Sequence, residues 1–158
     1  MFHLIQPLIP RPLHRMALRA AHVVRHRWRR WRRVRLEGVS IIARNAAGDL
    51  LLVRHAYGPD FWTLPGGGMK RGEPPVATAV RETREELGVM LHDPVLLGEV
   101  EESLSGSPHT AHVVSGTLRD TPQADGREIA KAQFFPLNGL PEPVSPLVAP
   151  RLALLEKR

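Results

Sequence analysis

The fold is decided by residues 67–89, which read GGMKRGEPPVATAVRETREELGV. Pro74 and Pro75 suit the start of a helix, because the backbone N–H that proline lacks has no partner in a first turn. Gly88 suits the left-handed conformation in which many helices end. The segment therefore predicts a helix over about residues 75–87.

This helix would carry two contrasting stripes, since successive residues are about 100° apart around a helix. The apolar stripe consists of Val76, Val80, Thr83 and Leu87. The acidic stripe, on the roughly opposite side, consists of Glu82, Glu85 and Glu86. Carboxylates three or four positions apart repel one another by about 0.2–0.5 kcal/mol per pair, and a cation would relieve that repulsion. We expect the first stripe to pack and the second to bind Mg²⁺, or alternatively Mn²⁺, both of which suit oxygen ligands.

A glycine-rich loop, Gly66 to Gly68, precedes the helix. Glycine lets the backbone approach a ligand closely and adopt positive φ, and Leu64-Pro65 would lead into the loop from a short strand over residues 61–64. Taken alone, three glutamates on a helix are as typical of a solvated face. The adjoining loop favours a ligand site instead, because a plain turn does not require acidic residues at these offsets.

Loop and helix together resemble the Nudix box. Its usual pattern is Gly, five residues, Glu, seven residues, Arg-Glu, an aliphatic, any residue, Glu-Glu, any residue, Gly and an aliphatic. The matching residues are Gly67, Glu73, Arg81, Glu82, Glu85, Glu86, Gly88 and Val89. At ordinary residue frequencies an accidental match is expected about once per billion windows. The one departure is Thr83, which stands at the first aliphatic position but is close to valine in shape.

The resemblance implies an α/β fold, an α/β/α sandwich of mixed β-sheets, and a set of roles. The implied metal ligands are Glu82, Glu85, Glu86 and the backbone carbonyl of Gly66. Glu82 and Glu85 would act in catalysis with Arg81, which would orient a neighbouring glutamate through a charge-assisted hydrogen bond. Glu73 would tie the loop to the helix, and Gly67 and Gly88 would be structural. Surface or capping chemistry is the alternative for Arg81 and Glu73.

A further acidic residue outside the box often completes the metal site or serves as the general base in this family. Glu128 is the first choice, because it stands shortly before an expected last strand at residues 129–135. Glu101 and Glu102, at the end of an earlier expected strand, compete with it. Each of the three could equally be an exposed carboxylate.

Three aromatic residues, Tyr57, Phe61 and Trp62, stand just ahead of the metal loop. An aromatic side chain at this place could stack on a nucleotide base, although packing in the core explains each as well. His55, His109 and His112 lack the spacing of a recognised metal motif, and we expect them to be surface or sheet residues.

The whole chain has the size of one ordinary domain, with 158 residues. It contains no cysteine, which excludes disulfides, thiolate zinc sites and cysteine nucleophiles and is compatible with a reducing, cytoplasmic location. Runs of β-forming residues between turn signals predict strands. The expected strands are residues 39–44, 50–56, 95–101 and 112–118 besides the two already named, and a closing helix is expected at 146–156.

The charge is divided unevenly along the chain. Residues 1–36 hold ten arginines and no acid, whereas the remainder has 12 Lys or Arg against 16 Asp or Glu and a net charge of −4. We therefore divide the chain into a basic arm, residues 1–36, and a catalytic domain, residues 37–158. Apolar residues at three- or four-residue steps predict an extra amphipathic helix over about residues 11–33 of the arm.

Three partners are open for residues 11–35. The helix could pack on the domain or on a second subunit in a homodimer, with its arginines facing water. It could instead bind an anionic membrane surface or nucleic acid such as RNA. No stretch approaches 18 consecutive apolar residues, so we do not expect a spanning helix.

These patterns lead to one main hypothesis: a Mg²⁺-dependent hydrolase that cleaves the pyrophosphate of a nucleoside diphosphate linked to another group. An alternative enzyme is an RNA 5′-end pyrophosphohydrolase that uses the basic arm to guide its substrate. A non-catalytic nucleotide-binding module is the alternative of a different class. Nothing in the loops outside the box identifies the substrate.

Overall fold

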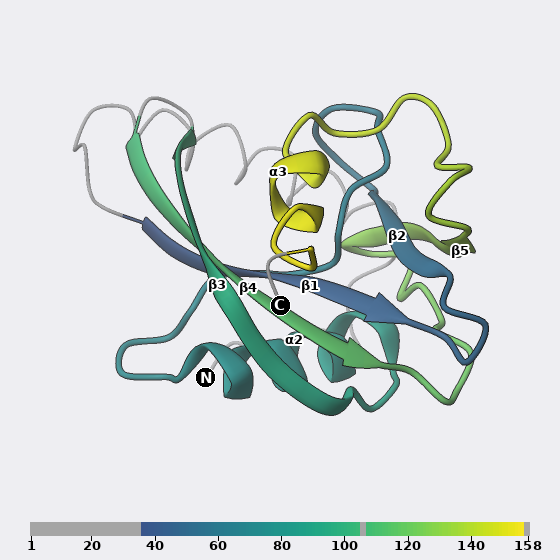
Figure 1. The fold of residues 1–158 in the computed structure, drawn as a ribbon, viewed down its shortest axis with the longest axis horizontal. Helices are drawn as coiled ribbons and strands as arrows, with labels where there is room; N and C mark the ends of the chain where they lie inside the picture. The colour runs from purple at the N-terminus through teal and green to yellow at the C-terminus, as the bar shows by residue number, and fades with distance from the viewer. Residues whose placement is uncertain (1–35, 105–106, 157–158) are drawn as a thin grey trace.

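A five-stranded mixed sheet lies between two helices (Figure 1). The computed structural model describes residues 36–104 and 107–156. The strands are β1 (Leu36–Arg44), β2 (Leu50–His55), β3 (His92–Leu104), β4 (Ser107–Thr117) and β5 (Ile129–Phe135), and the helices are α2 (Pro75–Leu87) and α3 (Val148–Leu152). The strand order is β3-β4-β1-β2-β5, in which β1 and β4 are parallel and the other neighbours antiparallel. This is the α/β sandwich that was expected, built on one mixed sheet.

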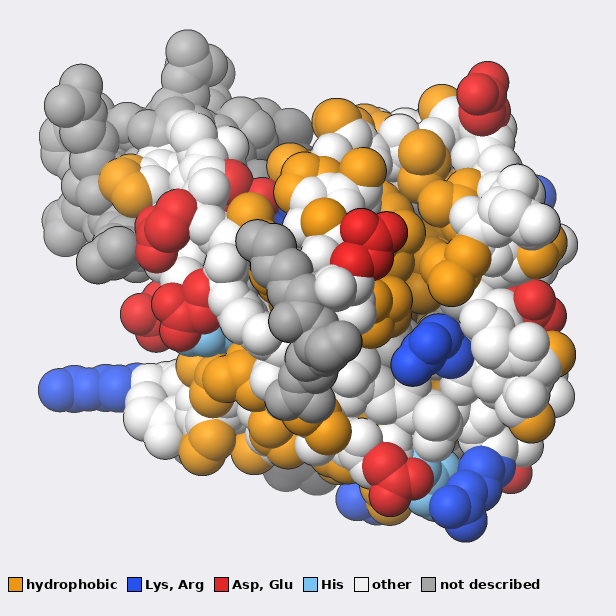
Figure 2. All heavy atoms as spheres, in the orientation of Figure 1, with side chains coloured by type: hydrophobic (Ala, Val, Ile, Leu, Met, Phe, Trp, Pro, Cys, Tyr) orange, Lys and Arg blue, Asp and Glu red, His pale blue; other side chains and the backbone are white. Residues whose placement is uncertain are grey.

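Two cores form because successive side chains of a strand point to opposite faces of the sheet. On the face that carries α2, the strands contribute Val39, Ile41, Ala43, Leu51, Val53, Val114 and Ile129 to the first core. On the face that carries α3, they contribute Ile42, Leu50, Leu52 and Val113 to the second, together with Trp62, Leu64 and Val148. Hydrophobic side chains also gather at the surface around α3 (Figure 2), where the second core is only partly covered.

The sheet opens between β1 and β2. The two strands pair at Arg44 and Leu50, next to a turn in which the amide N–H of Asp49 donates to the side-chain oxygen of Asn45 at 2.9 Å. Beyond that point residues 63–69 lie between them. The amide of Ile41 donates to the carbonyl of Pro65 at 2.8 Å and that of Val39 to Gly67 at 2.9 Å, while Thr63 and Val53 pair on the β2 side. The glycine loop is therefore held within the sheet by backbone hydrogen bonds.

The bounds of α2 and β5 match the prediction. The strands β3 and β4 are longer than expected, because they form a long hairpin whose polar outer positions hide the strand pattern. Residues 61–64 form single bridges rather than a strand. The helix expected at 146–156 is shorter, since the amides of Leu154 and Leu155 bond to carbonyls three residues back and tighten the chain into turns.

The predicted basic arm lies outside the described residues apart from Leu36, where β1 begins. Its helix and its partners stay predictions. Among residues 36–104 and 107–156, no helix is both long and apolar enough to cross a membrane.

Candidate functional site

The helix α2 begins and ends as its sequence indicates. Pro74 is its N-cap, with an extended backbone, and Pro75 occupies the first helical position. Gly88 ends the helix with φ of 69°, and its amide N–H donates to the carbonyl of Arg84 at 3.2 Å. The left-handed backbone explains why a glycine stands there.

The buried side of α2 differs from the predicted apolar stripe. The fully buried residues are Thr78, Ala79, Thr83 and Leu87, whereas Val76 and Val80 are half-buried. The helix has thus turned its acidic side towards the protein, so that the side chain of Glu82 is only 12% exposed. The predicted packing stripe is confirmed at Thr83 and Leu87, and Val80 packs partly against the first core. The acidic stripe is less exposed than a solvated face would be, because Glu82 lies against the glycine loop.

Thr83 shows how a hydroxyl replaces the aliphatic residue of the box. Its Oγ1 donates to the carbonyl of Ala79 at 2.8 Å. The hydroxyl is satisfied within the helix, so the rest of the side chain packs as valine would. The departure from the pattern therefore has no polar cost.

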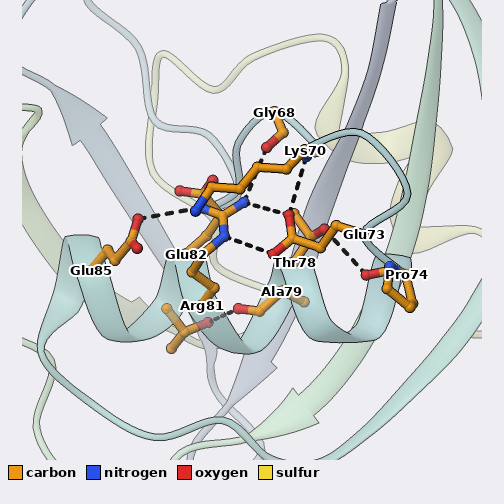
Figure 3. Close-up of polar contacts among 10 residues, drawn as sticks. Gly68, Lys70, Glu73, Pro74, Thr78, Ala79, Arg81, Glu82 and Glu85 are labelled. Atoms are coloured by element: carbon orange, nitrogen blue, oxygen red, sulfur yellow. Dashed lines mark hydrogen bonds and ion pairs between the residues drawn. The ribbon is translucent and has the colours of Figure 1, made fainter. Parts of the chain in front are cut away.

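Arg81 joins the loop to the helix through every one of its donors (Figure 3). A guanidinium has five N–H groups. Two of them bind the carboxylate of Glu73, because Nε donates to Oε1 and Nη2 donates to Oε2, each at 2.8 Å. Nη1 donates to Glu82 at 2.7 Å and to Glu85 at 3.2 Å, and Nη2 also donates to the carbonyl of Gly68 at 3.2 Å. Arg81 thus orients two of the expected metal ligands.

Glu73 fastens the end of the loop. Besides its paired contact with Arg81, its Oε2 accepts the amide N–H of Lys70 at 3.1 Å. The hydrogen bond from Arg81 lowers the pKa of Glu73 to about 2. This carboxylate is ionised throughout the neutral range and serves the loop rather than a ligand.

Gly66 and Gly67 are required by two close approaches. A Cβ atom on Gly66, which has φ of 153°, would lie 2.1 Å from the carbonyl oxygen of Val39. A Cβ atom on Gly67 would lie 2.5 Å from Cδ of Glu82. Both distances are shorter than real Cβ contacts, so a side chain would have to displace the backbone of Val39 in the first case and the carboxylate of Glu82 in the second. The first glycine seats the loop against β1, and the second makes room for a carboxylate.

Glu86 is the most perturbed carboxylate of the site. Its Oε2 is buried and has no hydrogen-bond partner among the described residues. Burial, followed by the charges of Glu82 and Glu128, raises the pKa of Glu86 to about 9. Burial also raises the pKa of Glu82, although Arg81 acts in the opposite direction. Glu82 and Glu86 are therefore shielded from water and lie close enough to each other and to Glu128 for their charges to interact.

Glu128 stands just before β5, and its charge acts on both Glu82 and Glu86. Asp125 holds its backbone, because Oδ1 of Asp125 accepts the amide N–H groups of Arg127, Glu128 and Ile129 at 2.8, 3.0 and 3.0 Å. The amide of Ala56 donates to the carbonyl of Glu128 at 2.9 Å. Sequence reasoning missed Asp125, although aspartate ahead of a glycine is typical of such side-chain-capped turns.

A cavity of about 470 Å³ unites these parts. From the box and its neighbours it is lined by Gly66, Gly67, Gly68, Glu82, Glu86 and Glu128. Tyr57 and Phe61 contribute to another part of its wall, as does His109. Four segments that are far apart in the sequence therefore surround one space.

Comparison with family models matches the NUDIX domain over residues 34–155. The chain belongs to the NUDIX domain family. Its Nudix box is the segment of residues 67–89 that forms the loop, α2 and the carboxylate cluster.

Individual Nudix relatives are similar over parts of the chain. An ADP-ribose pyrophosphatase of Mycobacterium tuberculosis is 35% identical over 97 residues, which cover 57% of this chain and 47% of the relative. An RNA pyrophosphohydrolase of Rhodospirillum rubrum is 40% identical over 63 residues, which cover 40% of this chain and 37% of the relative. The chain thus spans less than half the length of these two relatives. A crystal structure of a MutT NUDIX hydrolase from Burkholderia pseudomallei is 25% identical, with a TM-score of 0.70 over 77% of this chain and 98% of that one.

Nudix hydrolases generally use divalent metal ions. Among residues 36–104 and 107–156, no three acidic or histidine side chains converge closely enough to form a ready-made metal site. The donor set nevertheless fits a hard cation, because it consists of oxygen atoms. One of them, Oε2 of Glu86, is buried and has no partner in the described part of the chain. Burial and then repulsion by Glu82 and Glu128 raise the pKa of Glu86, and a cation would relieve that repulsion. The Nudix site is therefore suited to a metal that binds with its substrate.

Other residues predicted for the Nudix site lie in different places. Trp62 does not line the cavity; it is 7% exposed and packs edge-on against Phe135 in the second core, with ring centroids 4.9 Å apart. Its prediction as a base-stacking residue is corrected accordingly. Glu85 has a side chain that is 42% exposed, at the outer side of Arg81. Glu101 bonds to Thr110.

Proposed function

We propose that this Nudix protein is a Mg²⁺-dependent hydrolase, with Mn²⁺ as a possible replacement, that cleaves the pyrophosphate of a nucleoside diphosphate linked to another group. The observation that carries the proposal is the buried Oε2 of Glu86, which has no partner among residues 36–104 and 107–156 and lies in one cavity with Glu82 and Glu128. Structural ion pairs do not account for it, since an ion pair would supply the partner that this oxygen lacks. The relatives named for hydrolysis of ADP-ribose and RNA support the reaction class.

The ligand residues would be Glu82, Glu85, Glu86 and the carbonyl of Gly66. The carbonyls of Pro65 and Gly67 bond to β1, so the intervening carbonyl of Gly66 is directed to the other side of an extended chain. When bound, the metal would neutralise charge on the pyrophosphate and polarise its phosphorus. Arg81 keeps Glu82 and Glu85 in place for this task.

Glu128 would take the proton of the attacking water. It lines the cavity together with Glu82 and Glu86, and Asp125 fixes its backbone. A carboxylate within reach of a bound water can act as a general base. Tyr57 and Phe61 line the same cavity, and they would contact the nucleotide base.

The test is a screen of nucleotide sugars, ADP-ribose, dinucleoside polyphosphates and oxidised nucleoside triphosphates with Mg²⁺ and with Mn²⁺. The variant Glu86→Gln should abolish turnover of the best substrate, whereas Glu99→Gln, which changes a half-exposed carboxylate on β3, should leave it unchanged. Wild-type turnover by folded Glu86→Gln would refute the proposal. Hydrolysis in H₂¹⁸O would identify the phosphorus that is attacked.

A second substrate class, triphosphorylated RNA, is favoured by the ten arginines of residues 1–36. Phosphate contacts by basic residues make affinity fall steeply with salt. Deletion of residues 1–33 should then weaken RNA turnover selectively and flatten its salt dependence. Equal turnover of RNA and small nucleotides with and without the arm would reject this class.

A non-catalytic nucleotide-binding module is the remaining alternative. It would bind ADP-ribose or dinucleotides in Mg²⁺ or Mn²⁺ without turnover, which the same screen detects. A cytoplasmic location and a homodimer through the arm stay proposals that rest on the absence of cysteine and on the pattern of residues 11–33.

A further inference from the structure

A buried polar chain links α3 to the cavity. Arg151 of α3, with a side chain that is 6% exposed, donates from Nη2 to Oε1 of Glu102 at 2.8 Å and from Nε to Oγ of Ser40 at 2.8 Å. The same oxygen of Glu102 lies 2.9 Å from Nδ1 of His109. Side chains from α3, β3 and β4 thus hold one another in place, and the chain of contacts reaches the cavity wall at His109 and at Ser40.

This chain of contacts fixes the tautomer of a neutral His109. An ionised carboxylate accepts hydrogen bonds only, so the ring nitrogen that faces Glu102 must carry the proton. Nε2 then presents a lone pair. Among the described residues no hydrogen bond engages Nε2, which leaves it able to accept one from a ligand in the cavity.

Gly38 lets the imidazole approach the metal loop. A Cβ atom on Gly38 would lie 3.0 Å from the carbonyl oxygen of Gly67 and 3.2 Å from Nε2 of His109. Any larger residue would stand between the ring and the loop. His109 is also on the α3 face of the sheet, because it lies four residues before Val113 of the second core and every second residue of a strand points to the same face. The carboxylates Glu82 and Glu86 come from α2 on the opposite face.

The cavity is therefore lined by carboxylates and, next to the glycine loop, by the imidazole of His109. The pyrophosphate belongs with the carboxylates and their metal, and its oxygens have no proton to donate at neutral pH. The donors of a nucleoside diphosphate derivative are its sugar hydroxyls and base amines. A neutral His109 can bind only such groups through Nε2.

We propose that His109, held by Glu102 and Arg151, recognises the nucleoside part of the substrate by accepting a hydrogen bond from a sugar hydroxyl or a base amine. This inference rests on the proposed function only in taking the ligand to be a nucleotide. His109 is a specificity residue that makes no contact with the reacting phosphorus. The contact also gives α3, a five-residue helix far along the chain from the Nudix box, a part in substrate binding.

The experiment is calorimetric binding of AMP, 2′-deoxy-AMP, 3′-deoxy-AMP and IMP, with UMP as a second base, to the full-length protein in Mg²⁺. None of these contains a pyrophosphate, so binding is measured apart from hydrolysis. The wild type should bind AMP about 5- to 15-fold more tightly than the analogue that lacks the donor, as expected for one hydrogen bond. Weaker binding of one of the deoxy compounds than of AMP would identify a sugar hydroxyl as the donor, and weaker binding of IMP would identify the base amine.

Two variants separate recognition from folding. His109→Asn keeps an N–H for Glu102 and removes the acceptor at Nε2. The preference, which is the ratio of the affinity for AMP to that for the analogue lacking the donor, should therefore fall to about 1, while the melting temperature stays near that of the wild type. His109→Gln places an oxygen near Nε2 and should keep part of the preference. His112→Asn, on the opposite side of the same strand, is the control and should keep all of it.

The proposal is overturned by an unchanged preference in His109→Asn, by equal wild-type affinity for all the AMP analogues, or by failure of both AMP and UMP to bind. A changed melting temperature without a changed preference would assign His109 a structural role and overturn it as well. Failure of the hydrolysis screen with these binding results intact would reject the proposed reaction and leave this inference standing.

Discussion

The carboxylate of Glu82 lies against the backbone of Gly67, so closely that a Cβ atom on Gly67 would be 2.5 Å from Cδ. Glycine at this position of the box is therefore required by a side chain of α2, in addition to any requirement of the ligand. Neighbouring Gly68 differs, since a Cβ atom there would meet nothing within 4 Å. The same substitution at Gly67 and at Gly68 can therefore be compared with and without this contact.

Gly67→Ala should reduce turnover at least 10-fold and destabilise the fold by about 1–3 kcal/mol, because the methyl group must displace Glu82 or the loop. Gly68→Ala should change both by little. Steady-state kinetics and urea unfolding check the pair. Equal effects of the two substitutions would show that the contact with Glu82 is unimportant.

Arg81→Lys should destabilise the protein by about 1–3 kcal/mol, since an ammonium group cannot replace a planar donor that serves three carboxylates and a carbonyl. Turnover should fall too, because Glu82 and Glu85 lose their orientation. Urea unfolding and kinetics provide the measurement. Lys70→Arg, at an exposed position of the loop, is the control for a change of basic side chain.

The contact between Glu73 and Arg81 should affect how the unfolding free energy changes with pH in acid. Its pKa of about 2 in the folded protein lies below the ordinary 4.5, so the stabilisation is complete above about pH 4.5 and is lost as the pH falls towards 2. The difference in unfolding free energy between the wild type and Glu73→Gln should therefore shrink over this range. A difference that is constant from pH 6 to pH 2 would contradict the assignment.

Glu86 should act in the opposite sense in metal-free protein. Its pKa is raised from 4.5 to about 9 in the folded state, so the folded protein holds the proton more tightly and loses stability as the pH rises through this window. Glu86→Gln should be the more stable protein at pH 8, by about 1–3 kcal/mol. Mg²⁺ with AMP should reduce or reverse this difference in stability, because only the wild type has the Glu86 carboxylate to bind the metal. Thermal unfolding with and without chelator tests both parts.

Asp125→Ala should lower turnover about 10- to 100-fold through Glu128, at the lower end of what general-base catalysis contributes. The amide groups of Arg127, Glu128 and Ile129 lose their shared acceptor. Asp125→Asn retains an oxygen at that place and should restore most of the activity. If Asn and Ala are equally inactive, Asp125 has a role other than holding this turn.

The sequence predicted the local parts of the site well. The prolines and Gly88 determine the ends of α2 by backbone chemistry alone, and the spacing of Arg81 and Glu82 places them beside the loop. It predicted the buried side of α2 less well. Which stripe of a helix is buried depends on what covers it, and the contact of the glycine loop with Glu82 cannot be read from the helix.

Contacts between distant segments were also missed. His109 looked like an ordinary sheet residue because its partners, Glu102 and Arg151, come from another strand and from the last helix. Trp62 has the same aromatic character as Tyr57 and Phe61, yet strand alternation directs it into the core while the other two line the cavity. Such choices depend on tertiary packing, which residue type and spacing do not specify.

The full engagement of Arg81 has an electrostatic consequence. All five of its N–H groups are used inside the protein, and the described residues that line the cavity include neither lysine nor arginine. A doubly or triply charged pyrophosphate would therefore enter a space whose fixed charges have its own sign. Within the described part of the chain, that positive charge would come from counterions that travel with the substrate, so these residues would recognise the metal complex of the substrate rather than the free anion.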